Sequence, residues 1–404
     1  MATIVLYPSP GMGHLISMVE LGKFILHHHP SLSITILTVP PSFNTGSTAT
    51  YIRHISATVP SITFHHLPPI SLDLEPFPSM EAVIFEVLNR SNPHVRRALE
   101  TISLSATISA FIIDFFCTCA LPISAQLNIP TYYFFTSAGI IVNTFESLET
   151  KPFKAIREGK CNPGGHTPPV FSVGPLLATE GRQGGGGGID DCLSWLDKQP
   201  SKSVVYLCFG SLGLFSAAQL KEIAVGLERS GQRFLWVVRS PPSDDKSKRY
   251  LRPPEPDLDS LLPAGFLDRT KDRGLVLKSW APQVAVLNHE SVGGFVTHCG
   301  WNSVLESVCA AVPMVAWPLY AEQKMNRVVL VEDMKVALRM EVAEDDFVAA
   351  EEVERRVREL MESEKGRETR KVVEEMSVEG KSAMSEGGSS IAALAKLLEL
   401  WKPA

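Results

Sequence analysis

Short, unbroken hydrophobic runs alternate with segments of helical periodicity along the first half of the chain. The runs at 2–8, 32–39, 109–116 and 130–136 have the length of a strand and are almost wholly apolar, which is typical of parallel strands buried on both faces. Residues 14–26, between the first two runs, place their apolar side chains at helical spacing. This alternation predicts an α/β domain built on a doubly wound parallel sheet.

The pattern stops at RQGGGGG (residues 182–188) and then starts again. Five consecutive glycines carry no packing information and are typical of a flexible linker. Beyond them, strand-like runs such as SVVYLCFGS and RFLWVVR again alternate with helical segments. We therefore expect one domain at 1–182 and another at 190–385, joined by a linker at 183–189, with two similar sheets facing a cleft.

Two further helices are predicted near the C-terminal end. Residues 351–376 are rich in Glu and Arg and place Val353, Val357 and Leu360 at helical spacing, which indicates an amphipathic helix with a solvated face. The segment 389–402 is largely apolar, so the second helix must pack against another part of the protein.

The composition excludes several classes of protein. With 404 residues, 45% of them hydrophobic and 20% charged, the chain is an ordinary globular one. The net charge of −6 argues against nucleic-acid binding, and no apolar run reaches the roughly 18 residues of a transmembrane helix. The N-terminus lacks the basic and small-residue features of a secretory signal. Together with seven scattered cysteines, this predicts a cytoplasmic protein.

The stretch FVTHCGWNSVLES (295–307) joins an apolar strand-like run to a helical segment. Small and hydrogen-bonding residues occupy the junction, at Gly300, Trp301, Asn302 and Ser303. A helix that begins directly after a strand presents unpaired backbone N–H groups and the positive end of its dipole. The junction therefore predicts an anion-binding site.

The window from Trp280 to Gln323 resembles the signature of the plant family-1 glycosyltransferases, the UDP-sugar-dependent enzymes of secondary metabolism. It contains W-A-P-Q, H-C-G-W-N-S, a Glu three residues later and a closing E-Q. The P-S-P-G-M-G-H start, the F-I-I-D-F-F segment and the F-G-S motif extend the resemblance over nearly the whole chain, closest to the flavonoid and chalcone glucosyltransferase branch. The resemblance implies a GT-B fold of two Rossmann-like domains, an N-terminal one for the acceptor and a C-terminal one for the UDP-sugar. It also implies that the helix at 389–402 returns to the N-terminal domain.

The same resemblance implies a set of donor-binding residues whose chemistry suits a nucleotide sugar. Trp280 offers a flat face to uracil, while the backbone of Ala281 reads the edge of the base. Glu306 can accept hydrogen bonds from the ribose hydroxyls, and His298 lies where the diphosphate is expected. Gln323 matches a contact to the sugar hydroxyls. The full set is Ser211, Trp280, Ala281, Gln283, His298, Gly300, Trp301, Asn302, Ser303, Glu306, Tyr320, Glu322 and Gln323.

His14 matches the position of the family's catalytic base. A phenolic hydroxyl has a pKa of about 10 and is a weak nucleophile at neutral pH, whereas imidazole titrates near 6.5 and can take its proton. Asp114 is the only charge within its apolar run, where a carboxylate is costly without a partner. We expect it to orient His14, as an acidic residue orients histidine in hydrolases. The alternative is that Asp114 has a structural role and holds a loop or the end of a helix.

The resemblance also favours glucose as the transferred sugar. Family members that transfer glucuronate can carry Arg at the position of Trp301, and Gln323 is the form associated with glucose more than galactose; xylose stays open. The expected reaction is inverting O-glucosylation of a phenolic acceptor such as a flavonoid or chalcone. Two alternatives remain: C-glucosylation of a polyphenol ring, and a UDP-sugar epimerase of the same fold.

The sequence does not identify the acceptor, since loops of the N-terminal half form the acceptor pocket. Family members usually carry a longer segment after the position of Ser137, so the junction there, together with the glycines at 184–188, indicates a shortened chain. Beyond the UDP-sugar and a small phenol we expect no cofactor, no metal ion and no nucleic acid, and we expect a monomer. The motif Asp257-Leu258-Asp259, which resembles the D-x-D of metal-dependent transferases, lies in a Pro-rich segment and is discounted.

Overall fold

The structure is a computed structural model that describes residues 2–40, 48–135, 141–160, 169–178, 189–243 and 253–401. The chain divides into two compact units. The first is formed chiefly by Met1–Ala178 with Gly380–Ala404, and the second by Thr179–Asp244 with Pro253–Glu379. The predicted linker at 183–189 falls almost entirely outside the described residues.

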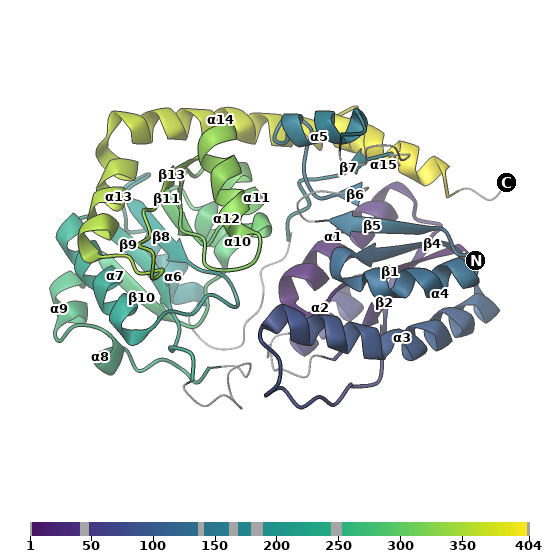
Figure 1. Ribbon diagram of the computed structural model, residues 1–404. Helices are drawn as coiled ribbons and strands as arrows, with labels where there is room; N and C mark the ends of the chain where they lie inside the picture. The colour runs from purple at the N-terminus through teal and green to yellow at the C-terminus, as the bar shows by residue number, and fades with distance from the viewer. Residues whose placement is uncertain are drawn as a thin grey trace. The chain divides into compact units, whose positions relative to one another are not determined.

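A seven-stranded sheet forms the centre of the first unit, in the order β3-β2-β1-β4-β5-β6-β7. Every pairing in it is parallel. Its strands are β1 (Ala2–Tyr7), β2 (Ser33–Thr38), β3 (Ile62–His66), β4 (Thr107–Asp114), β5 (Thr131–Phe135), β6 (Ile141–Val142) and β7 (Phe171–Ser172). The helical elements are α1 (Met12–His28), α2 (Thr48–Thr58), α3 (Met80–Ser105), η1 (Phe115–Ala120), α4 (Leu121–Gln126), α5 (Thr150–Arg157) and α15 (Ser389–Glu399), as Figure 1 shows.

The second unit repeats this plan with a six-stranded sheet in the order β10-β9-β8-β11-β12-β13, again with parallel pairings. Its strands are β8 (Val204–Cys208), β9 (Arg233–Val238), β10 (Gly274–Lys278), β11 (Val292–Thr297), β12 (Met314–Ala316) and β13 (Ala337–Arg339). Its helices are α6 (Ile189–Leu196), α7 (Ala217–Ser230), α8 (Leu258–Leu261), α9 (Phe266–Thr270), α10 (Gln283–Leu287), α11 (Trp301–Cys309), α12 (Gln323–Val328), η3 (Val329–Asp333) and α13 (Ala350–Glu362), followed by α14 (Glu364–Ala383), within which the chain passes to the first unit.

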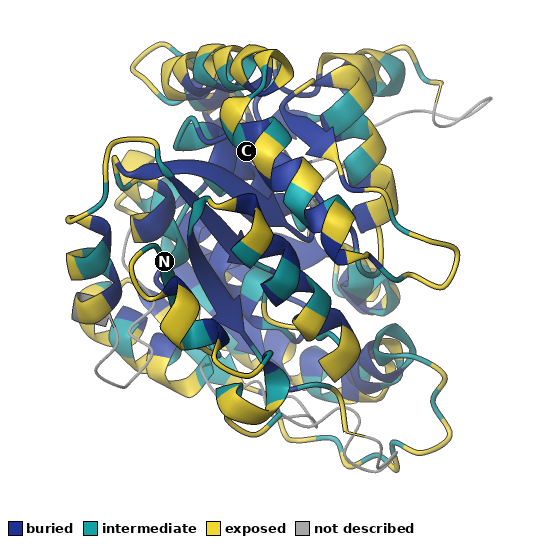
Figure 2. Cartoon of the chain, turned by 90° about the vertical axis from the view of Figure 1, so that its left-hand side faces the viewer, coloured by how far each residue is buried: buried dark blue, intermediate teal, exposed yellow. Residues whose placement is uncertain are grey.

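Alternate side chains of each strand enter the hydrophobic layers on opposite faces of the sheet. In β1, Ile4 and Leu6 pack with α1 and α15, whereas Val5 and Tyr7 pack with α3 on the other face. Because both faces are covered, the strands are apolar without interruption. Figure 2 shows the consequence: the strands are buried, and the helices expose one side to solvent. The predicted doubly wound α/β architecture is confirmed.

Two predicted elements end earlier than expected, because a polar side chain caps a helix. The expected strand 109–116 stops at Asp114, whose Oδ1 atom accepts a hydrogen bond from the backbone N–H of Phe116 at 3.1 Å and so begins η1. The expected helix 351–376 is split into α13 and α14 at Ser363, whose Oγ atom accepts from the N–H of Gly366 at 3.0 Å.

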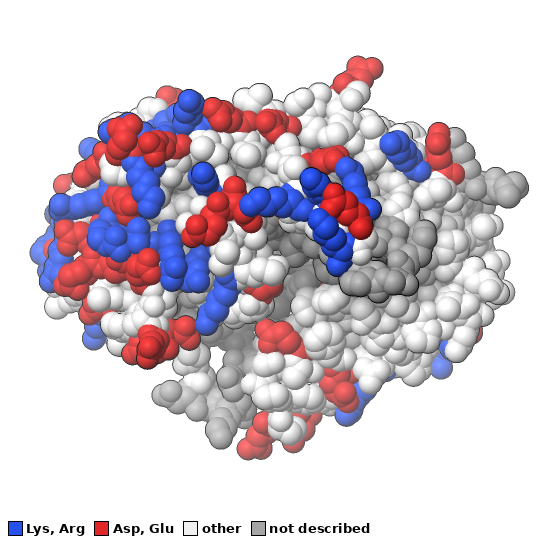
Figure 3. Space-filling view, turned by 45° about the horizontal axis from the view of Figure 1, so that its top comes forward, with Lys and Arg blue, Asp and Glu red and all other residues white. Residues whose placement is uncertain are grey.

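The outer face of α13 is solvated, as its sequence predicted. Arg355 pairs with Glu352 one turn earlier, and Figure 3 shows basic and acidic side chains interspersed on the left of the surface in view. The returning C-terminal helix is also confirmed, since Leu394, Leu397 and Trp401 lie in the core that α1 and β1 share. Among the described helices, none has both the length and the hydropathy needed to cross a bilayer.

Candidate functional site

The predicted site residues cluster where the strand order of each sheet changes direction. In the first sheet this switch lies between β1 and β4, and in the second between β8 and β11. Ligands of open parallel sheets bind outside the carboxyl ends of the strands at such points. His14 follows β1 and Asp114 ends β4, while Ser211 follows β8 and His298 follows β11. Each unit therefore places its candidate residues at its own switch point.

His14 and Asp114 are in direct contact in the first unit. The Nδ1 atom of His14 lies 2.7 Å from Oδ2 of Asp114. Only 5% of the Asp114 side chain is exposed, against 30% for His14. A carboxylate at Nδ1 selects the tautomer that carries its proton there, which leaves Nε2 to accept one. The pair can therefore act as an oriented general base.

A cluster of aromatic side chains lies beside His14. The ring of Phe116 meets the His14 ring edge to face, with centroids 5.6 Å apart. Phe116 also contacts Phe85 and Phe115, at 5.4 and 5.9 Å between ring centroids. Phe85 and Phe115 remain about half exposed despite their size. An exposed aromatic cluster beside a base suits a planar, aromatic ligand.

His298 is a buried polar group of the second unit's site, with 6% of its surface exposed. A Cβ atom added to either Gly210 or Gly300 would lie 2.5 Å from its Nε2 atom, so both positions need the small residue. Burial lowers the pKa of His298 to about 4, and within the described residues its Nδ1 atom has no hydrogen-bond partner. A neutral, buried imidazole with an unsatisfied nitrogen is suited to a hydrogen-bonding ligand.

Gln283 ties together two other predicted residues. Its Nε2 atom donates to Oγ of Ser303 at 2.9 Å and to Oε2 of Glu306 at 2.6 Å. Ser303 lies in the first turn of α11 and Glu306 one turn further on. The network therefore holds the Ser303 hydroxyl in the first turn of α11, where an anion is favoured, and the Glu306 carboxylate one turn further from that end.

The closing E-Q of the signature has two different environments. Gln323 is 2% exposed, and its Oε1 atom accepts hydrogen bonds from the backbone N–H groups of Leu319 at 2.9 Å and Tyr320 at 3.0 Å. Its amide NH₂ is therefore the group it can offer to a sugar hydroxyl. Glu322, directly before it, is exposed. The ring of Tyr320 lies 6.2 Å from that of His298, which connects this segment to the buried histidine.

The remaining predicted residues lie on the neighbouring segments of the second unit. Trp280 follows β10 and is half-buried, while Ala281 is buried. Trp301 and Asn302 open α11, with the indole of Trp301 almost wholly buried. Among the described residues, no three His, Cys, Asp or Glu side chains lie close enough to hold a metal ion.

Comparison with known proteins decides the family. The UDP-glucoronosyl and UDP-glucosyl transferase profile matches residues 191–371. The chain is 49% identical to the phloretin 2'-O-glucosyltransferase of Malus domestica, with 96% of this chain and 97% of that one covered. It is 46% identical to the anthocyanidin 5,3-O-glucosyltransferase of a Rosa hybrid cultivar, with 99% and 98% covered. The chain belongs to this transferase family.

A solved structure supports the same assignment. Phytolacca americana UGT2, complexed with UDP-2fluoro-glucose and pterostilbene, aligns with a TM-score of 0.85 and 34% identity over 99% of this chain and 100% of that one. The predicted GT-B fold and UDP-sugar-dependent glycosyltransferase activity are thereby confirmed. The alignment to the apple glucosyltransferase runs over 467 positions although this chain has only 404 residues. The relative therefore has segments that this UDP-glycosyltransferase lacks; the predicted junction after Ser137 lies outside the described residues.

Two features of this glycosyltransferase were missed from the sequence. Phe116 was visible only as part of F-I-I-D-F-F, and its contact with His14 depends on η1 starting directly after Asp114. Arg239, at the end of W-V-V-R, donates from Nη1 to the backbone carbonyl of Ser211. In each region the available signal was a single charged residue at the end of an apolar strand: Asp114 near Phe116, and Arg239 itself.

Proposed function

We propose that this protein is an inverting, UDP-glucose-dependent glucosyltransferase that forms O-glucosides on phenolic acceptors of the flavonoid or chalcone type. The contact between His14 Nδ1 and Asp114 Oδ2 carries the proposal, because it presents a basic Nε2 beside exposed aromatic rings. The names of the relatives agree with it: one glucosylates phloretin and another anthocyanidins, and a solved neighbour holds pterostilbene.

In the proposed reaction, Nε2 of His14 takes the proton of the phenolic hydroxyl while its oxygen bonds to the anomeric carbon of glucose. The bond from that carbon to the diphosphate breaks, and its electron pair leaves with UDP. Attack opposite the leaving group inverts the configuration to a β-glucoside. Asp114 stabilises the imidazolium that forms.

The proposed donor site uses the second unit. Uracil stacks on Trp280, the ribose hydroxyls donate to Glu306, and the sugar contacts Glu322 and the amide of Gln323. His298, Ser211, Asn302, Ser303 and the N-terminus of α11 offset the charge of the leaving diphosphate. No step in this scheme needs a divalent metal ion, so we expect full activity in the presence of EDTA. Scattered cysteines in the sequence support a cytoplasmic location, and we propose a monomer.

The test is incubation of the protein with UDP-glucose and a panel of flavonoids, chalcones and simple phenols, followed by chromatography with mass detection. A product heavier by one hexose that acid hydrolyses to the free phenol supports the O-glucosyltransferase. An acid-stable hexoside would instead identify a C-glucosyltransferase. Conversion of the UDP-sugar without any acceptor would favour an epimerase. The same panel with UDP-xylose and UDP-galactose tests the preference for glucose.

A further inference from the structure

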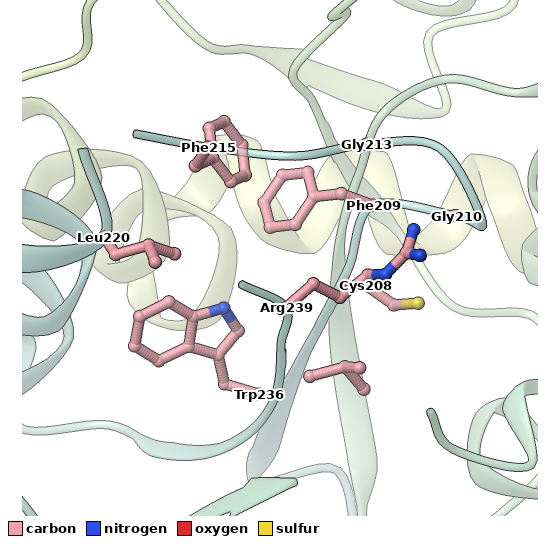
Figure 4. Close-up of a pocket in the computed structure, with 9 residues that line it drawn as sticks. Cys208, Phe209, Gly210, Gly213, Phe215, Leu220, Trp236 and Arg239 are labelled. Carbon is pink, nitrogen blue, oxygen red and sulfur yellow. The ribbon is translucent and has the colours of Figure 1, made fainter. Parts of the chain in front are cut away.

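Arg239 makes a backbone contact to the loop that connects β8 to α7. This loop, residues 209–215, is called the F-G-S loop here, and it follows the end of β8. Arg239 follows β9, the strand that pairs with β8. Its Nη1 atom donates to the carbonyl oxygen of Ser211 at the tip of the loop. Figure 4 shows the guanidinium directed toward the backbone near Gly210.

The base of the F-G-S loop is held by aromatic packing, whereas its tip is not. The ring of Phe209 meets Phe215 at 4.6 Å and Trp317 at 5.4 Å, both edge to face. Ser211 and Leu212, at the tip, are exposed. Aromatic contacts therefore fix where the loop leaves and re-enters the unit, but they do not fix the orientation of the tip.

A small cavity lies between the F-G-S loop and β9, with a volume of about 10 Å³. Its lining includes Phe209, Gly213, Trp236 and Arg239. That volume is room for about one water molecule, so side-chain packing from below does not fill the space under the loop. Because this space is not filled, the orientation of the tip depends more strongly on the hydrogen bond from Arg239 than it would above a filled core.

The tip also determines the surroundings of His298. Gly210 has φ of +73° and approaches the imidazole so closely that a Cβ atom would lie 2.5 Å from Nε2. A displacement of the tip would therefore move Ser211 and alter the space beside His298 together. Ser211 and His298 are two of the groups that the proposed function assigns to the donor diphosphate.

We propose that Arg239 is a positioning residue for the UDP-sugar diphosphate. By holding the Ser211 carbonyl, it fixes the F-G-S loop against His298. The inference rests on the proposed function, in which Ser211 and His298 contact the diphosphate. It requires the residue to matter for the phosphate part of the donor and not for the nucleoside part, which the proposed function assigns to Trp280 and Glu306.

The test compares the dissociation constants of uridine and UDP by calorimetry, and KM for UDP-glucose, in Arg239→Met, Ser211→Ala and the wild type. The control is Arg233→Met, at the opposite end of β9, where Nε donates to Gln199 at 3.2 Å. We expect Arg239→Met to weaken UDP about tenfold and to leave uridine unchanged, as loss of one supporting hydrogen bond predicts. Arg233→Met should change neither constant.

Equal weakening of uridine and UDP in Arg239→Met, or unchanged binding of both, would overturn the inference. A weakened Ser211→Ala beside a normal Arg239→Met would remove the positioning role and keep the proposed diphosphate contact. If Arg239→Met bound UDP weakly and Ser211→Ala bound it normally, the positioning role would stand and only the contact of the Ser211 hydroxyl with the diphosphate would be withdrawn. Should Arg239→Met fail to fold, Arg239→Lys is measured instead, and a smaller loss confined to UDP supports the inference.

Discussion

The imidazole of His14 donates from Nδ1 to Oδ2 of Asp114 across 2.7 Å, although the two residues are 100 positions apart in the sequence. The pairing of β1 with β4 makes this contact possible, since Tyr7 lies opposite Ile113 at the ends of the two strands. His14 is in the first turn of α1, and Asp114 is the last residue of β4. The sheet therefore holds both side chains at the same edge.

Replacing Asp114 by Asn should lower kcat by about 100-fold or more, because the neutral amide does not stabilise the imidazolium. The dissociation constant of UDP should not change, since Asp114 lies in the first unit and the proposed donor residues lie in the second. Steady-state kinetics and calorimetry measure the two quantities. A variant that loses kcat and UDP affinity together would show that Asp114 supports the fold more than the reaction.

Changing Gln323 to Glu should raise KM for UDP-glucose about tenfold and leave UDP affinity unchanged. The carboxylate can still accept from the N–H groups of Leu319 and Tyr320, but it replaces the NH₂ that we propose donates to the sugar. The loss of one such hydrogen bond costs up to about 1.5 kcal/mol, or roughly a factor of ten. Binding of UDP and UDP-glucose is compared by calorimetry. If both weaken equally, Gln323 acts by supporting its backbone segment and does not contact the sugar.

His298 should contribute to UDP binding as a neutral group. Burial lowers its pKa to about 4, so in the free protein it is uncharged throughout the range from pH 6 to 8. We expect His298→Ala to weaken UDP about tenfold, and the ratio of mutant to wild-type dissociation constants to stay constant over that range. A ratio that grows as the pH falls from 8 to 6 would instead indicate a cationic imidazole.

Glu149 should make the protein less stable as the pH rises. Burial raises the pKa of its carboxyl to about 7, so the folded state binds more protons than the unfolded state between about pH 4.5 and 7, and stability falls with pH over that window. Over this window, the ionisation of Glu149 lowers the free energy of unfolding by about 3 kcal/mol. Glu149→Gln should therefore be more stable than the wild type at pH 8 and similar at pH 4.5, as urea unfolding measures.

The control for this prediction is Glu158→Gln, at the end of the same helix α5, where the carboxylate is exposed. Its effect on stability should be small at both pH values. If Glu149→Gln and Glu158→Gln gave the same pH profile as the wild type, the buried carboxyl of Glu149 would not be the source of the pH dependence.

The sequence predicted the fold well because periodicity is a local property. Unbroken apolar runs such as 2–8 identified buried parallel strands, and their alternation with helices identified the two sheets. The ends of elements were predicted less well, since they depend on caps. Asp114 ends β4 and Ser363 separates α13 from α14 through hydrogen bonds of their side chains to the backbone.

The candidate site was predicted through its motif, which names residues but gives no distances. The motif includes Gln283 and Glu306, yet their hydrogen bond appears only once α10 and α11 are placed side by side. The motif assigned no role to Phe116 or Arg239. Both residues matter through contacts with segments that are distant in the sequence. Contacts of this kind follow from the topology of the sheets and not from any short pattern.

In the proposed reaction, His14 removes the proton of a phenolic acceptor during glucosyl transfer. The most direct test measures initial rates with UDP-glucose for the wild type and His14→Ala over phenols of decreasing pKa, ending with a nitrophenol that is ionised at neutral pH. His27→Ala, on the exposed last turn of α1, is the matched control. We expect the initial rate of His14→Ala to fall at least about 100-fold with ordinary phenols and far less with the ionised one. An equal loss across the series, or no loss with any phenol, would contradict the proposed reaction.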